Sequence, residues 1–243
     1  MNRILLWDLP VRLFHWLLAG GLVFAAVISL VLGEDSPLFP YHAIVGLAMA
    51  LMVCLRVAWG VVGSRYARFW TFVFSPGEAL AYMKATLVGG GKRYIGHNPG
   101  SALAILGLLA LVLAMAGTGI LMGQGNEGLK EVHEVLAYVF VGVAAVHVAG
   151  VGLHTIQHRE NITASMIHGK KSGEPSEGIE SAQPIVAAIF LLIVGAFAVT
   201  LVRGYDPAGM TITLPVVGTV LQVGENENGA EGGIGNPGDA DDD

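Results

Sequence analysis

The order of apolar and polar positions along the chain predicts five membrane-spanning helices. An α-helix needs about 20 residues to cross about 30 Å of hydrocarbon, and five apolar runs of roughly this length are present. They lie at residues 11–32, 41–62, 100–122, 131–156 and 184–203. The first run has no small-residue cleavage site after a short apolar core, so we expect a retained helix and not a signal peptide.

The segments between and after these runs predict the rest of the organisation. Residues 63–100 mix aromatic and basic side chains, as is typical of a segment on a membrane surface, and a short amphipathic helix is expected after Pro76. The polar stretch HGKKSGEPSEGIESAQP at 168–184 predicts a flexible linker to the fifth run. The stretch MTITLPVVGTVLQV at 210–223 predicts a short strand or a segment that lies against a partner. The acidic remainder at 224–243 is expected to be disordered in isolation.

The composition agrees with a membrane protein. Of the 243 residues, 53% are hydrophobic and only 13% are charged, which is far from the average of a soluble domain. Cys54 is the only cysteine, so the chain has no internal disulfide, no CxxCH haem attachment and no thiolate cluster. We therefore assign the chain to the all-α integral membrane proteins.

The distribution of Lys and Arg predicts the orientation of the helices. Basic residues favour the cytoplasmic loops of membrane proteins, and here only two of the 13, Lys130 and Arg203, fall on one side of the membrane. The other side holds Arg3, Arg12, Arg56, Arg65, Arg68, Lys84, Lys92, Arg93, Arg159, Lys170 and Lys171. The N-terminus is therefore expected in the cytoplasm and the C-terminus outside.

The acidic residues are also unevenly placed. The net charge is −6, and the segment after Arg203 holds eight acids and no base. This segment argues against nucleic acid as a partner on the outer side, and the topology alone explains the basic residues on the inner side. No nucleic-acid partner is therefore expected.

Five histidines lie within the predicted spans or at their ends. Ionisable side chains in a membrane are costly, usually face the interior of the bundle and mark function. His133 and His147 are 14 residues apart, which puts them on nearly the same face of one helix, about 21 Å apart along its axis. The set is His15, His42, His133, His147 and His154.

The depth of each histidine in the membrane predicts two pairs. The second and fourth spans both run inward, so His42 and His133 lie near the outer surface. The first span runs outward, which puts His15 near the inner surface. His147 lies about 24 Å below the start of its span, at much the same level as His15. His154 falls at or beyond the inner boundary and is the weaker candidate.

Two histidines that approach from different helices of a four-helix bundle are the arrangement in which such bundles hold haem iron. The two pairs therefore predict two haem groups that are bound without covalent attachment. Three arginines near the inner surface are suitable partners for haem propionates: Arg12, Arg65 and Arg68. Three glycines would allow the flat macrocycle to approach a helix backbone: Gly20, Gly46 and Gly142.

Simpler explanations exist for each of these residues. A single histidine in a membrane helix is as often an interhelical hydrogen-bond donor or an interfacial residue. The glycines fit ordinary helix packing, and topology explains the arginines. Four rings that fall into two depth-matched pairs are harder to explain in this way. The loop histidines, His97, His158 and His168, are expected to be solvated or locally hydrogen-bonded.

Four stretches of the sequence together resemble the bacterial cytochrome b561 family, which includes the b-type cytochrome subunit of membrane-bound Ni/Fe hydrogenases. They are WDLPVRLFHW at 7–16, YHAIVGLAMALMVCLRVAWGVVGSRYARF at 41–69, GKRYIGHNP at 91–99 and KEVHEVLAYVFVGVAAVHVAGVGLHTIQHREN at 130–161. The resemblance covers about residues 3–171. It implies a four-helix core that binds two b haems and moves electrons between the membrane quinone pool and a periplasmic redox partner.

The resemblance also implies a ligand set. By motif, His15 matches the ligand on the first helix, His42 the ligand on the second, and His133 and His147 the two ligands on the fourth. The resemblance gives no function to the fifth span or the acidic tail. His154 adds another ring near the inner haem and leaves the ligand choice there open.

We therefore expect four parts: a dihaem core at 1–171, a cytoplasmic linker at 172–183, a fifth transmembrane helix at 184–203 and an acidic periplasmic tail at 204–243. The expected location is the inner membrane of a bacterium. The tail would dock a basic c-type cytochrome, join a larger complex with the fifth helix, or remain solvated and disordered.

Three functions are weighed against one another. The first is an electron carrier between quinone and a periplasmic partner such as a c-type cytochrome. The second is the membrane anchor subunit of a periplasmic hydrogenase or dehydrogenase. The third is a non-haem metal-ion transporter or structural anchor, which the scarcity of carboxylates inside the spans disfavours. No nucleophile–base pair, phosphate loop or dinucleotide fingerprint is present, so no catalytic residue is predicted.

Overall fold

The computed structural model describes residues 2–90 and 92–224. Within these ranges, five helices are long and apolar enough to cross a membrane, which confirms the predicted spans to within a few residues and indicates a multi-pass membrane protein. They are α1 (Leu9–Ala26) with a π-helical continuation (Val27–Leu32), α2 (Phe39–Val62), α4 (Pro99–Gly123), α5 (Lys130–His158) and α7 (Pro184–Arg203).

Local signals in the sequence determine where the helices begin. Asp8 caps α1 by accepting a hydrogen bond from the backbone N–H of Val11 at 2.9 Å. Asn98 and Ser101 form a reciprocal capping box at the start of α4, and Pro99 occupies the first turn, where its missing N–H has no cost. A short helix was expected after Pro76, and α3 (Pro76–Leu87) is present there and begins with another capping box.

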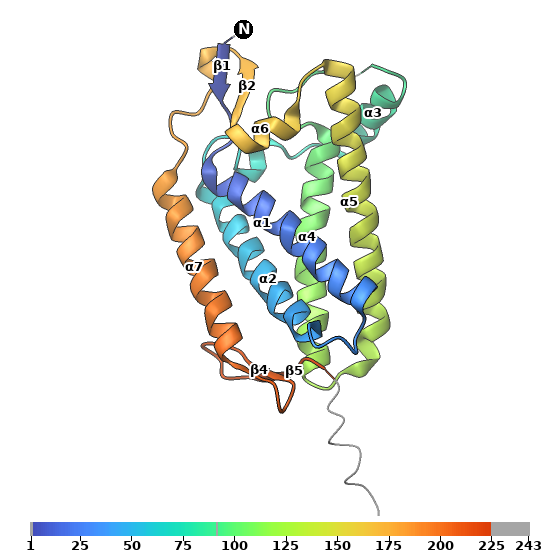
Figure 1. Ribbon diagram of the computed structural model, residues 1–243. Coiled ribbons are helices and arrows are strands. Elements are labelled where there is room, and N and C mark those ends of the chain that lie inside the picture. Colours follow the sequence, from blue (N-terminus) through green and yellow to red (C-terminus); the bar gives the residue numbers. More distant parts are fainter. Residues whose placement is uncertain (1, 91, 225–243) are drawn as a thin grey trace, which may run out of the picture.

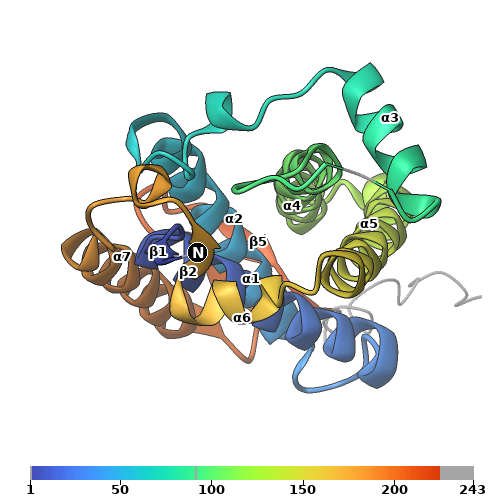
Figure 2. The ribbon, with the colours of Figure 1, turned by 90° about the horizontal axis from the view of Figure 1, so that it is seen from above.

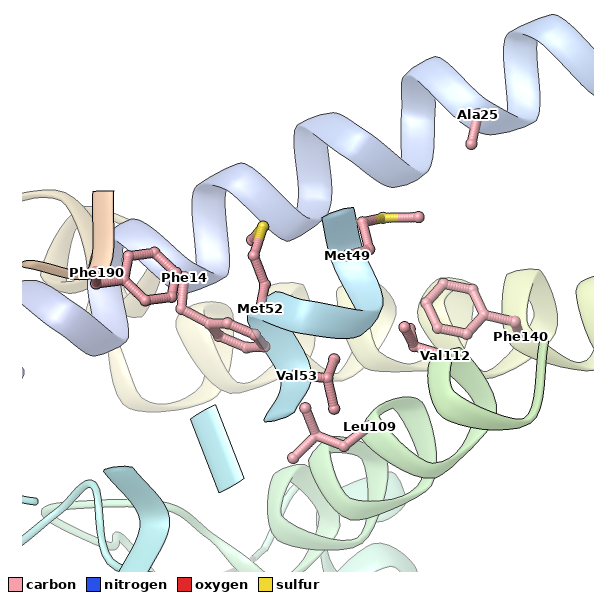
Figure 3. Packing of buried hydrophobic residues seen from close by; sticks show 9 residues of the cluster. All are labelled: Phe14, Ala25, Met49, Met52, Val53, Leu109, Val112, Phe140 and Phe190. Carbon is pink, nitrogen blue, oxygen red and sulfur yellow. The ribbon is translucent and has the colours of Figure 1, made fainter. Parts of the chain in front are cut away.

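The membrane helices pack around one apolar core. Helix α4 contacts α2 and α5, while α2 also contacts α1 and α7. In Figure 3, Phe14 of α1, Met52 and Val53 of α2 and Leu109 of α4 meet at its centre. Helix α7 lies beside α1 and α2, on the opposite side of the molecule from α5 (Figures 1 and 2).

A small polar layer covers one end of the helices. Strand β1 (Asn2–Leu5) pairs antiparallel with β2 (Lys170–Gly173), and the short helix α6 (Ile162–His168) precedes β2 (Figure 1). The backbone N–H of Ile179 also donates to the carbonyl oxygen of Leu5 at 2.8 Å. The flexibility predicted for residues 168–184 is therefore wrong, because backbone hydrogen bonds to the N-terminal strand order much of this polar stretch.

A small sheet lies at the opposite end of the helices. Strands β3 (Tyr205–Asp206), β4 (Thr211–Thr213) and β5 (Val220–Gln222) pair in sequence order (Figure 1). Ile212 and Leu221 of this sheet pack on Ile44 of α2 and Leu201 of α7. The predicted strand is confirmed, and the segment folds back on its own helices. Most of the acidic remainder, residues 225–243, lies outside the described residues.

Candidate functional site

Two histidines near the end that carries β3 to β5 meet between α2 and α5. The ring centres of His42 and His133 are 6.3 Å apart, and their planes are inclined by 69°. A metal ion between two imidazoles lies about 2.0 Å from each nitrogen and about 3 Å from each ring centre, so rings that share a metal have centres about 6 Å apart. The structure therefore brings the predicted outer pair to a separation that suits one shared metal.

Hydrogen bonds hold both rings of this outer pair in one orientation. The carbonyl oxygen of Ala25 lies 3.1 Å from Nδ1 of His42 and can only accept a hydrogen bond. This contact places the proton on Nδ1 and leaves the lone pair on Nε2. A bond of this kind from the second ring nitrogen is the usual support of a metal-ligating histidine.

The second ring of the outer pair has a hydroxyl partner. Oγ1 of Thr118 lies 2.8 Å from Nδ1 of His133 and donates its own proton to the carbonyl oxygen of Met115 at 2.9 Å. Because the hydroxyl proton is used in this way, Oγ1 accepts from the ring. His133 therefore also carries its proton on Nδ1 and has a free Nε2 lone pair.

The predicted inner pair comes from α1 and α5. His15 and His147 are both half-buried and lie close enough for their charges to interact. Nδ1 of His15 is buried without a hydrogen-bond partner among residues 2–90 and 92–224. An orphaned buried nitrogen costs about 1–3 kcal/mol, and only a group that reaches Nδ1 itself would offset this cost.

Two further buried polar groups lie on elements at the end that carries β1 and β2. Nη1 of the Arg56 guanidinium and Nδ1 of His97 are buried, and neither has a hydrogen-bond partner in the described ranges. Arg56 on α2 is 5% exposed, and the charges of Arg56 and His147 both act on His97. Arg56 is therefore a buried cation, and its guanidinium carbon lies 5.0 Å from the centre of the Phe69 ring. The position of Arg56 inside an apolar run was a signal of burial that the count of basic residues did not use.

His97 is not solvated as expected. Its ring centre lies 4.7 Å from that of Trp7 and 4.3 Å from that of Phe72. Burial and the nearby charges of Arg56 and Lys171 lower the pKa of His97 to about 3, so its ring is neutral at physiological pH. Its neighbours come from segments far apart in the sequence, which the loop position of GHNP did not reveal.

Two of the three arginines that were predicted as propionate partners donate hydrogen bonds to backbone carbonyl groups at the end that carries β1 and β2. Arg12 donates a hydrogen bond to the carbonyl oxygen of Ile167. The Arg65 guanidinium lies 3.4 Å from the carbonyl oxygen of Ser176. Nε of Arg68 is buried and has no hydrogen-bond partner in the described part of the chain. Arg12 and Arg65 therefore each have one backbone acceptor. Nε of Arg12, like Nη1 of Arg56 and Nε of Arg68, has no hydrogen-bond partner in the described part of the chain.

The three glycines singled out in the sequence do not lie at tight helix crossings. A Cβ atom added at Gly20, Gly46 or Gly142 would meet no other atom of the described chain within 4 Å. By contrast, a Cβ at Gly60 would lie 2.1 Å from the Phe69 ring. Close contact with the Phe69 ring, in the segment after α2, therefore explains Gly60. The other three face lipid or space that a bound group can fill.

His154 belongs to a separate polar cluster. It is 3% exposed and its ring centre lies 4.4 Å from that of His158. Its Nε2 lies 3.9 Å from a carboxylate oxygen of Glu160. The structure thus associates His154 with residues beyond the helix end, which agrees with its lower rank as a ligand.

The candidate metal-ligating side chains are considered as pairs of histidines. In residues 2–90 and 92–224, no group of three or more His, Cys, Asp or Glu side chains is placed to hold a metal ion. A haem needs only two axial ligands, because the macrocycle supplies the other four nitrogens. Two imidazoles with fixed Nδ1 protons therefore fit haem iron.

Comparison with known proteins gives the following matches. The family profile of prokaryotic cytochrome b561 matches residues 6–169. The probable Ni/Fe-hydrogenase B-type cytochrome subunit of Rhizobium leguminosarum bv. viciae is 25% identical over 214 residues, which cover 70% of this chain and 89% of the relative. Its counterpart in Bradyrhizobium diazoefficiens is 23% identical over 215 residues, covering 69% and 85%. No solved structure matches the chain.

Proposed function

The chain belongs to the prokaryotic cytochrome b561 family, and on this premise we propose that it carries electrons across the membrane through two haem groups. It is a membrane cytochrome b, and its family implies haem b as the cofactor. The outer haem is held by His42 and His133, and the inner haem by His15 and His147. The observation that carries this proposal is the 6.3 Å separation of the outer rings, both of which have their Nδ1 atoms hydrogen-bonded.

The protein's own residues prepare each site for the cofactor. The Ala25 carbonyl and the Thr118 hydroxyl fix the outer rings so that each Nε2 lone pair is free, and Phe39 stacks at 5.8 Å on His42. The buried Arg56 has an N–H donor without a partner among the described residues, and this donor would pair with a propionate of the inner haem. Arg12 and Arg65 lie at the same end and remain second candidates. Haem iron supplies the one-electron chemistry when bound.

The redox partners follow from the direction of the helices. The excess of Lys and Arg at the end that carries β1 and β2 supports a cytoplasmic N-terminus and a periplasmic C-terminus in a bacterial inner membrane. The inner haem would then exchange electrons with membrane quinone. The outer haem would exchange them with a periplasmic partner such as a c-type cytochrome.

A second candidate function is favoured by the relatives. Proteins similar to this chain are named as probable B-type cytochrome subunits of Ni/Fe hydrogenases. The chain would then anchor a periplasmic hydrogenase or another redox enzyme, and the same two haems would receive its electrons. The family assignment and the paired donors disfavour a non-haem metal-ion transporter.

We retain the four proposed parts of the chain. Residues 1–171 form the haem core, 172–183 the linker, 184–203 the fifth helix and 204–243 the tail. Helix α7 contacts both α1 and α2, and the sheet that follows packs on Ile44. These contacts support a role for the fifth helix and the first part of the tail in completing the outer end, where a larger complex would attach.

The experiment is a count of haem per chain with a dithionite-reduced minus oxidised spectrum of the purified protein. Two haem b are expected in the wild type, and one is lost or perturbed in each of His42→Ala and His147→Ala. His154→Ala should retain both. A colourless protein, or loss of haem only in His154→Ala, would contradict the ligand assignment. Copurification of a large periplasmic enzyme would favour the second candidate function, a membrane anchor subunit.

A further inference from the structure

A cavity of about 620 Å³ lies at the end of the molecule that carries β1, β2 and α6. Its wall includes five basic side chains and one acid. The basic residues come from the first strand, the segment before α4, the end of α5 and β2. They are Arg3, Arg93, Arg159, Lys170 and Lys171, and the acid is Glu160.

The single carboxylate does not balance these charges. Glu160 accepts from Arg93 at 3.0 Å and lies 3.4 Å from Nζ of Lys171, so it is already shared between two cations. Arg3, Arg159 and Lys170 have no carboxylate partner within residues 2–90 and 92–224. The cavity therefore carries an excess of positive charge that the described part of the chain does not neutralise.

The His168 ring in the cavity wall is approached by two hydrogen-bond donors. The backbone N–H of Lys170 donates to Nδ1 of His168 at 3.0 Å, while the Arg3 guanidinium lies 2.8 Å from Nε2 of the same ring. A neutral imidazole has only one acceptor nitrogen, so it cannot accept both hydrogen bonds. Burial and the charges of Arg3, Arg12 and Lys170 lower the pKa of His168, which keeps the ring neutral. The flexible Arg3 side chain is therefore left with hydrogen-bonding capacity for another acceptor.

The cavity is separated along α5 from the proposed inner ligand His147. His158, which lines the cavity, is 11 residues beyond His147 on α5. This spacing corresponds to about 16 Å along the helix axis. The excess charge is a property of the cavity itself, and the inference does not depend on that haem.

We propose that this cavity binds a phosphoryl group, and that its source is the headgroup of an acidic phospholipid. Converging Arg and Lys side chains are the usual partners of phosphate oxygens. The cavity lies at the end of a membrane helix, which is the level of the headgroups. Beside it, Ile156 is 77% exposed and Ile167 is 60% exposed, and these side chains offer an apolar surface to acyl chains. Inorganic phosphate shares the headgroup's chemistry and is the alternative source.

The test compares two charge-matched double variants of the haem-loaded protein in detergent. Arg159→Gln/Lys170→Gln removes two cations from the cavity. Lys84→Gln/Lys92→Gln removes two exposed cations from the same end of the molecule but not from the cavity wall. Native mass spectrometry measures the binding of dioleoyl phosphatidylglycerol and dioleoyl phosphatidylcholine, and calorimetry at low ionic strength measures the binding of inorganic phosphate alone.

Phosphatidylglycerol should bind the wild type more tightly than phosphatidylcholine does. The cavity variant should lose this affinity by roughly 10- to 30-fold, because each basic group near a membrane surface contributes about 1 kcal/mol. The Lys84/Lys92 variant should bind as the wild type does. If the cavity variant loses affinity for inorganic phosphate while the Lys84/Lys92 variant does not, and the two lipids bind alike, the cavity binds a phosphoryl group from a soluble source. Wild-type affinity for both probes in the cavity variant, with an unchanged haem spectrum to show folding, would overturn the proposal.

Discussion

Oγ1 of Thr118 on α4 lies 2.8 Å from Nδ1 of His133 on α5. The same hydroxyl donates to the carbonyl oxygen of Met115 at 2.9 Å. The backbone of one helix thus orients a ring on its neighbour. Because the proton position on His133 follows from this chain of bonds, the proposed haem ligand depends on a residue that does not itself contact the iron.

Thr118→Val should weaken binding of the outer haem. Valine has nearly the same shape but cannot accept from His133, and loss of such a supporting bond typically lowers metal affinity by about 10- to 100-fold. Haem titration of the apoprotein measures this change. Thr118→Ser retains the hydroxyl and should bind haem as the wild type does. Equal affinity of the Val and wild-type proteins would show that the bond has no supporting role.

Gly46→Leu should exclude the outer haem without disturbing the helices. Gly46 follows His42 by one helical turn and so lies on the same face, where an added Cβ meets no other described atom within 4 Å. A leucine there would fill space next to the ring. We expect a haem count reduced by one, with unchanged helix content by circular dichroism. Gly107→Leu, at an equally open position on α4, is the control and should retain both haems.

Arg56→Gln should lower the reduction potential of the inner haem. As the proposed partner of an inner-haem propionate, the buried guanidinium favours the reduced cofactor, which carries less positive charge. We expect a decrease on the order of 60 mV, which is a tenfold change in a one-electron equilibrium. Potentiometric titration resolves the two haems, and the outer potential should not move. Arg56→Lys keeps the charge and should recover much of the shift.

Asp8→Ala should destabilise the whole bundle. The carboxylate is 1% exposed and accepts from Val11 N–H, from the Trp59 indole at 3.0 Å and from the Ser64 hydroxyl at 2.5 Å. It therefore joins the start of α1 to the end of α2. Loss of the helix cap, and of the acceptor for the Trp59 and Ser64 donors, should cost about 2–4 kcal/mol. The thermal unfolding temperature measures this cost. The unfolding temperature of Asp8→Asn, which retains one acceptor oxygen, should fall between those of Asp8→Ala and the wild type.

Low pH should destabilise the end of the molecule that carries β1 and β2. Burial raises the pKa of Glu160, but its hydrogen bond to Arg93 and the charges of Lys171 and Arg93 outweigh burial, so the pKa is lowered overall. A carboxylate with a depressed folded pKa stabilises the protein above its unfolded value of 4.5, and this stabilisation is lost as the pH falls through the folded pKa. Unfolding temperatures measured below pH 4.5 should therefore fall less steeply in Glu160→Gln than in the wild type. Parallel curves for the two proteins would contradict this assignment.

The sequence was sufficient to predict the membrane helices and the meeting of His42 with His133. Span length and hydropathy are local properties, and helical rise converts a residue number into a depth. The N-terminal ends were also readable, since Asp8, Ser75 and Asn98 are ordinary capping residues. These features need no knowledge of distant contacts.

The features that the sequence did not reveal depend on contacts between distant residues. Polar composition suggested a flexible segment at 168–184, but β2 pairs with a strand at the other end of the chain. His97 was read as a loop residue because nothing nearby in the sequence predicts its packing against Trp7 and Phe72. The charge imbalance around Glu160 likewise arises from segments that meet only in the folded protein.

The antiparallel pairing of Asn2 with Gly173 has a consequence for biosynthesis. A growing chain emerges from the ribosome N-terminus first, so β1 must wait for its partner until four of the five spans have been made. At about 5–20 residues per second, this interval is roughly 10 to 30 s. The first helix can enter the membrane early, but its N-terminal strand can close only after the fourth has followed. This layer can therefore be completed only after α1, α2 and α5, which carry the proposed haem ligands, have been made.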